Sequence, residues 1–153
     1  MLFPSFTLKS VTFVYAISIF VVYIITVIAY RVNEKKYDYH WTCLLYQAGA
    51  KFSYSISRKG HIHRLILPMI LHNGFLHFLL NFLSLFFIGF TVEIALKSKL
   101  KFILLLLLSA LGGNLFSALV SPCNISIGAS TSIYGINGVN CVWYYLNWYR
   151  LGP

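Results

Sequence analysis

The sequence predicts an all-α fold, a polytopic helix bundle that lies in a membrane, and three observations support this fold class. Charged residues are 10% of the 153 residues, against about 25% in soluble domains. Hydrophobic residues are 59%, and the mean hydropathy is +0.77. The apolar residues also form long runs without a charge. This composition excludes a disordered chain, and it leaves too few polar groups to cover a soluble protein.

The first predicted membrane span is residues 11–30, a charge-free run of about 20 residues, which is the length that crosses a bilayer. A cleaved signal peptide is the alternative interpretation, because Lys9 precedes this run. The run is longer than a signal core of about 7–15 residues, and no A-x-A cleavage site follows it. We therefore expect a retained helix.

The rest of the sequence predicts three more spans within one domain that covers residues 1–153. Residues 31–64 hold seven basic residues and several aromatic residues, which is typical of a loop at the membrane surface, here predicted on the outer side. The second span is predicted at 69–92, with Pro68 suited to the start of a helix. Pro122 interrupts the next charge-free run and divides it into predicted spans at 102–120 and 129–149.

The lysines give partial information on topology. Lys97, Lys99 and Lys101 follow the second span, whereas the loop at 121–128 has no charge. The positive-inside rule then places the lysine loop and the N-terminus in the cytoplasm and residues 31–64 outside, although the seven bases of that segment indicate the opposite. The net charge of +9 fits topology signals and the lipid bilayer better than nucleic acid, which we do not expect as a partner.

Polar residues at membrane depth are costly and often functional. His77 and Asn81 are four residues apart and share one helix face, as do Ser130 and Tyr134. Taken singly, each has a structural alternative, such as a packing serine or a polar contact between helices. His72 and His77 are five residues apart, which does not suit a pair of metal ligands on a helix, so we expect no metal and no cofactor.

The three cysteines lack a C-x-x-C spacing and establish no disulfide framework. Cys43 and Cys123 share the predicted outer side, so these two residues could pair. Cys141 lies within the fourth predicted span, and we expect it to be a buried apolar residue.

In combination, these residues resemble the rhomboid family of intramembrane serine proteases. The pattern H-x-x-x-x-H-x-x-x-N from His72 to Asn81 is similar to the second-helix signature of the family. Gly128-Ala-Ser130 is similar to its nucleophile motif. Further similarities to the family, in the expected order, are found at Gly60-His-Ile-His-Arg64, Glu93, Gly112-Gly-Asn114 and Tyr134. The resemblance covers about residues 40–140.

The resemblance implies an incomplete rhomboid-like fold with the first four core helices. It implies that Ser130 is the nucleophile and that His77 and Asn81, with the Ser130 backbone N–H, form an oxyanion hole. The implied substrates are transmembrane helices of other membrane proteins. Supporting roles follow by resemblance for His72, Tyr134, Gly128, Glu93 and Arg64.

Two departures from the family pattern affect this expectation. Thr131 stands where the family usually has glycine, and a β-branched residue there is expected to crowd the site or to shift the serine. The general base of the family is a histidine on the sixth core helix, and all five histidines here precede Ser130. Serine without a base is a weak nucleophile, so the chain as given is expected to be inactive or nearly so.

Three hypotheses follow. The favoured one is a truncated form of an active rhomboid protease, because no packing role requires Ser130, His77 and Asn81 together. The second is a catalytically dead rhomboid that binds transmembrane clients, disfavoured because Ala129 stands where inactive members often have proline. The third is an unrelated channel or transporter fragment, disfavoured because the spans lack an acid or an ion-ligand cluster. The sequence does not indicate which membrane holds the protein.

Overall fold

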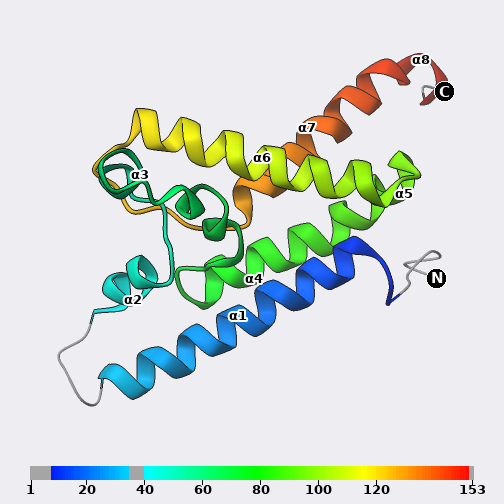
Figure 1. Ribbon diagram of the computed structural model, residues 1–153. Helices are drawn as coiled ribbons and strands as arrows, with labels where there is room; N and C mark the ends of the chain where they lie inside the picture. The colour runs from blue at the N-terminus through cyan, green and yellow to red at the C-terminus, as the bar shows by residue number, and fades with distance from the viewer. Residues whose placement is uncertain (1–7, 35–39, 152–153) are drawn as a thin grey trace.

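The computed structural model describes residues 8–34 and 40–151, and the regular secondary structure in this part of the chain consists of helices, with one isolated bridge between Lys51 and Ser126. The predicted all-α class is confirmed. Three helices in it are long and apolar enough to cross a membrane; they are α1 (Val11–Glu34), the continuous helix Phe75–Leu96 and α6 (Lys99–Val120). The next long helix is α7 (Ser130–Leu146), and its crossing of the membrane stays a prediction. Figure 1 shows α1 beside α4, and α7 crossing α6.

The segment predicted as an outer loop contains short helices. These gather at the end of the bundle that lies away from both termini (Figure 1). In chain order they are α2 (Trp41–Gln47), α3 (Ser53–Lys59) and the 3-10 helices η1 (Ile62–Leu65) and η2 (Leu67–Ile70). The C-terminal turn is α8 (Trp148–Leu151).

The second long helix begins at Phe75, later than the predicted residue 69, whereas the other three begin within three residues of their predicted starts. Pro68 starts the short helix η2 instead. The chain then runs extended at Leu71 and turns at Gly74, whose φ is +83°. His72 therefore lies before the helix and not within it.

A π-helical turn, η3 (Leu85–Gly89), lies inside this second long helix, between α4 (Phe75–Ser84) and α5 (Phe90–Leu96). Such turns widen a helix by one residue and bend its course. Gly89 packs against Thr12 of α1, where a Cβ would lie 2.9 Å from the threonine methyl group. The bend and the missing side chain let α1 approach closely.

Glu93 fixes the beginning of α1. Its Oε1 accepts the backbone N–H of Val11 at 2.7 Å, and its Oε2 accepts that of Thr12 at 2.8 Å. The first N–H groups of a helix have no partner within the helix, and a negative charge there opposes the positive end of the helix dipole. In this structure the Glu93 carboxylate joins α5 to α1.

Lys51 fixes the opposite end of the bundle. Its side chain is completely buried, and its Nζ donates to the backbone carbonyls of Ser117, Ser121 and Asn124 at 3.0–3.3 Å. A cation suits the C-terminal end of a helix, where the last carbonyls lack partners within the helix. Burial lowers the pKa of this ammonium group.

Arg64 organises the short helices. Its Nη1 donates to the carbonyls of Tyr46 and Ala50 at 2.7 and 2.8 Å, and its guanidinium lies 4.2 Å from the centre of the Tyr46 ring. The arginine is buried. It therefore holds the connection after α2 against η1, and its role is structural.

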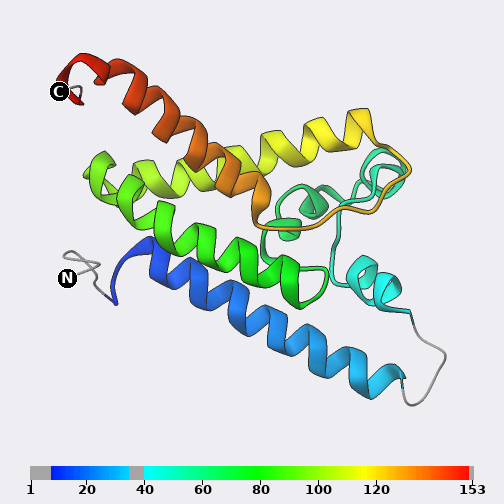
Figure 2. The ribbon, with the colours of Figure 1, turned by 180° about the vertical axis from the view of Figure 1, so that it is seen from behind.

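The apolar core lies between α1, α4, α6 and α7, with Ile19, Phe78, Phe102 and Ile136 among its buried members. Cys43, Cys123 and Cys141 are all free and exposed. The expected burial of Cys141 is wrong, because the second half of α7 leaves the bundle and no described helix covers it (Figure 1 and Figure 2).

Candidate active site

Ser130 is the first residue of α7, and its position is fixed by the loop before it. Gly128 donates its N–H to the carbonyl of Pro68 at 2.9 Å, and Ser126 pairs with Lys51 through two backbone hydrogen bonds of 2.9 and 3.1 Å. Figure 2 shows this loop passing beside the short helices. The backbone N–H groups of the first turn of α7 point toward the same end, where they can stabilise negative charge.

His77 lies in the first turn of α4, and a backbone contact defines its tautomer. Its Nδ1 accepts the N–H of Asn73 at 3.3 Å. A neutral imidazole that accepts at one nitrogen carries its proton on the other, so this contact assigns the proton to Nε2. Nε2 is therefore the hydrogen-bond donor of the ring.

Gly128 provides the space in which the histidine and the serine meet. A Cβ at Gly128 would lie 2.9 Å from His77 Nε2 and 3.2 Å from Ser130 Oγ. The φ of Gly128 is +132°, a conformation that side chains other than glycine rarely adopt. Glycine is required here for both reasons, and both polar atoms lie next to the position that a side chain at Gly128 would fill.

These residues line a cleft of about 400 Å³ between α4 and α7. The structure brings together four of the predicted site residues, His77, Asn81, Ser130 and Tyr134, of which Tyr134 is 74% exposed. Asn137 also lines the cleft and was not predicted. Its spacing of seven residues from Ser130 places it on the same helix face, and this periodicity was the signal available in the sequence.

The amide of Asn81 is partly committed to its own helix. Its Nδ2 donates to the carbonyl of His77 at 2.7 Å, and the side chain is 7% exposed. An amide nitrogen carries two N–H groups, so one stays available to a ligand in the cleft. The bond to the helix fixes the direction of the second N–H group.

His72 packs against the ring of His77 and does not itself line the cleft. The side chain is completely buried, and neither ring nitrogen makes a hydrogen bond of good geometry. A weak contact with the Ile70 backbone is the one interaction that favours the charged form of the ring. Its ring packs 5.4 Å from that of His77 and edge-on to Phe78. Burial, with a smaller effect from His77, lowers the pKa of His72 to about 4, so the ring is neutral at neutral pH.

Thr131 does not crowd the cleft, in contrast to the expectation from its β-branched side chain. Its Cβ and Cγ2 lie 3.0 and 2.9 Å from the position that a Cβ of Gly113 would occupy on α6. The threonine is thus accommodated by a glycine of the neighbouring helix. Arg64 and Glu93, both predicted as supporting residues, lie outside the residues that line the cleft.

The cleft offers limited acid–base chemistry. Among the residues that line the cleft, one is a histidine, His77, and its Nδ1 already accepts a hydrogen bond. Within residues 8–34 and 40–151, no group of three or more His, Cys, Asp or Glu side chains could hold a metal ion. The arrangement can place a serine hydroxyl beside hydrogen-bond donors, which is suited to an addition that creates negative charge on oxygen.

The fold and the cleft define an integral membrane protein built from helices, with a serine at a helix start facing a histidine and an asparagine. The family model of the Rhomboid domain matches residues 59–153, and the chain belongs to the rhomboid family.

The chain is similar to several curated proteins of this family. Rhomboid-like protease 1 of Toxoplasma gondii is 35% identical over 152 residues, which are 99% of this chain and 50% of that protein. RHOMBOID-like protein 4 of Arabidopsis thaliana is 41% identical over 81 residues, which are 51% of this chain and 20% of that protein. Rhomboid-like protease 3 of Toxoplasma gondii is 36% identical over 100 residues, 62% of this chain and 37% of that protein.

The chain therefore spans half or less of the length of these relatives. No solved structure matches it.

Proposed function

We propose that this chain carries the nucleophile and the oxyanion hole of a rhomboid-type intramembrane serine endopeptidase, whose substrates are transmembrane helices. The observation that carries the proposal is the cleft in which Ser130, at a helix start, meets His77 and Asn81. Two relatives with the name protease, from Toxoplasma gondii, support the reaction class.

In the proposed reaction, Ser130 Oγ attacks a peptide carbonyl carbon, and the carbonyl oxygen becomes an oxyanion. The donors for this oxyanion are His77 Nε2–H, the free N–H of Asn81 and the backbone N–H of Ser130. Such donors act strongly in a site with few waters, because a low dielectric constant strengthens each hydrogen bond to charge. Removal of one donor is expected to lower the rate by about 10²–10³.

The proton of Ser130 needs a base, and we propose that a later segment of a longer protein supplies a histidine for this step. The relatives are at least twice as long as the region that this chain matches in them. On this proposal the 153-residue chain is a truncated form with little activity of its own.

The second candidate is a catalytically dead rhomboid that binds transmembrane clients. The observation that favours it is the absence of a second histidine among the residues that line the cleft in the described part of the chain. Ala129 before the serine and the ordered contact of His77 with Asn73 favour the protease instead.

The test is the cleavage of a fluorescent model transmembrane substrate in liposomes, by the 153-residue chain and by the product of the complete transcript. We expect cleavage by the longer product, little cleavage by the short chain, and complete loss with Ser130→Ala. Ser84→Ala is the matched control, because Ser84 lines the same cleft and has no proposed role. Cleavage that survives Ser130→Ala would overturn the proposal, and substrate binding without cleavage would favour the client-binding form.

A further inference from the structure

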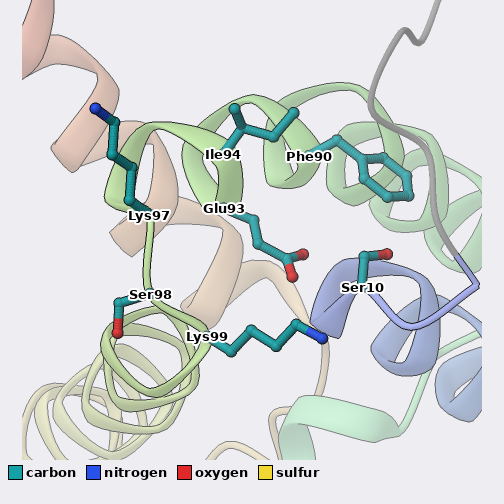
Figure 3. Close-up of a pocket in the computed structure, with 7 residues that line it drawn as sticks. All are labelled: Ser10, Phe90, Glu93, Ile94, Lys97, Ser98 and Lys99. Carbon is teal, nitrogen blue, oxygen red and sulfur yellow. The ribbon is translucent and has the colours of Figure 1, made fainter.

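A second cavity lies at the opposite end of the bundle from Ser130, where α1 begins, α5 ends and α6 begins. It has a volume of about 270 Å³ and is lined by polar and apolar side chains; these are Ser10, Phe90, Glu93, Ile94, Lys97, Ser98 and Lys99. Figure 3 shows them in place. Because three membrane-length helices have their ends here, this cavity lies where the bundle meets the membrane surface.

Among the described residues, the lysines around this cavity form no ion pair with an acid. Glu93 is the acid that lines it, and both of its oxygens already accept backbone N–H groups of α1. Lys99 donates to the carbonyl of Lys9 at 2.8 Å, and the ammonium group of Lys97 points away from Glu93 (Figure 3). Within the described residues, the one ion pair is Arg31–Glu34, which is near the other end of α1.

The start of α6 adds to this positive charge. Lys99 and Lys101 lie in its first turn, which contains no acid. The first turn of a helix favours anions and disfavours cations, so two lysines there oppose the helix dipole. This unfavourable arrangement is relieved when an anion binds at the same place.

The apolar half of the cavity indicates what kind of anion fits. Ile94 is 52% exposed beside the lysines, and Leu100 at the start of α6 is 66% exposed. Lysines that lie directly beside exposed aliphatic side chains match a headgroup phosphate above acyl chains, whereas a free phosphate ion gains nothing from the apolar side.

We propose that this end of the bundle binds one anionic phospholipid, with the headgroup phosphate held by the ammonium group of Lys99 and by that of Lys97 once its exposed side chain turns toward the cavity, and with the acyl chains along α5 and α6. This site lies apart from the Ser130 cleft and does not depend on its chemistry. The bound phosphate bridges the end of α5 and the start of α6, and it stabilises the junction at which Glu93 holds α1.

The test uses the 153-residue chain in nanodiscs of phosphatidylcholine, either alone or with a minor fraction of phosphatidylglycerol. Mass spectrometry after gentle extraction counts the lipids that stay bound, and thermal unfolding measures stabilisation. We expect one retained phosphatidylglycerol per chain and a higher melting temperature. The variant K97Q/K99Q is expected to lose retention by roughly ten-fold or more, because each lysine attracts the headgroup.

The control variant R58Q/K59Q removes the same two charges from exposed positions of α3. It is expected to retain the lipid like the original chain. K97R/K99R preserves the charge and is expected to retain it too, which separates lost binding from lost folding. Equal losses in both glutamine variants would overturn the proposal in favour of general surface charge. Stabilisation by inorganic phosphate in pure phosphatidylcholine would overturn the assignment to a lipid.

Discussion

The two ends of the bundle use their charges in opposite ways. At the end that holds the cleft, Lys51 and Arg64 are buried, and their donors are satisfied by backbone carbonyls. At the other end Glu93 is buried and satisfied by backbone N–H groups, while Lys97 and Lys99 are exposed. Lys51 and Arg64 therefore stabilise the fold, whereas Lys97 and Lys99 are exposed on the surface of the protein.

This difference reduces the conflict in the count of bases without removing it, because five of the seven bases in residues 31–64 remain against the three lysines that follow the second span. Two of the seven bases in residues 31–64, Lys51 and Arg64, are buried and donate hydrogen bonds to backbone carbonyls. They are therefore not charges that face water. The positive-inside rule concerns bases near the membrane surface, so buried bases should not be counted. The comparison leads to four predictions, from the largest expected effect to the smallest.

Replacing the buried lysine tests the end that holds the cleft. Lys51→Met is expected to lower the free energy of unfolding by about 3 to 4 kcal/mol, because three carbonyls lose a charged donor. Urea unfolding in detergent, followed by helical circular dichroism, measures this change. Lys59→Met removes an exposed lysine of α3 and should change stability by less than about 0.5 kcal/mol. Equal effects of the two substitutions would contradict the assigned role of Lys51.

His72 should make the stability of the same end depend on pH. Its pKa is about 4 in the folded protein against an ordinary value of 6.5, so between these values the unfolded chain binds a proton that the folded chain does not. Stability is therefore complete above pH 6.5 and decreases as the pH falls to about 4, by about 3 kcal/mol in total.

Unfolding measured across this pH range should show a smaller slope for His72→Gln than for the original chain. His40→Gln, at an exposed position, is the matched control for the loss of an imidazole ring. A slope that is identical in all three proteins would show that His72 does not titrate as described.

Gly128→Ala tests the space between His77 and Ser130. The new Cβ would overlap the His77 ring, and the backbone φ of +132° is strained for alanine, so we expect a loss of about 2 kcal/mol. Gly138→Ala is the matched control, because nothing lies within 4 Å of its Cβ and helix propensity favours alanine by about 0.5–1 kcal/mol. Thermal unfolding of both variants should therefore shift in opposite directions.

The smallest effect is expected at the other end. Glu93→Gln removes the negative charge at the start of α1 and retains only one of the two oxygen acceptors, so a loss of about 1–2 kcal/mol is expected. Glu34→Gln removes an exposed carboxylate and should cost less than that, since exposed ion pairs contribute about 0.2–1 kcal/mol. Urea unfolding compares the two, and a larger effect at Glu34 would contradict the difference between buried and exposed charges.

The sequence predicted those parts of the structure that depend on local pattern. Charge-free runs located the starts of three long helices, and helical spacing placed Ser130 and Tyr134 on one face. The start at Phe75 was missed because it depends on the backbone conformation of Gly74, which apolar periodicity does not report.

The buried role of Lys51 was also missed, since a lysine in a basic segment resembles a solvated base until its distant carbonyl partners are known. For Thr131 the sequence predicted a steric conflict that the structure does not contain. Its side chain suggested crowding, and only the contact with Gly113 of another helix shows where it fits.

The backbone pairing of Ser126 with Lys51, and of Gly128 with Pro68, has a consequence for biosynthesis. The serine is held in place by segments that leave the ribosome long before it does. A nascent chain thus carries an unassembled centre until the loop before α7 returns to the earlier segments. The Ser130 cleft is therefore assembled late in synthesis, as a consequence of the order of these segments along the chain.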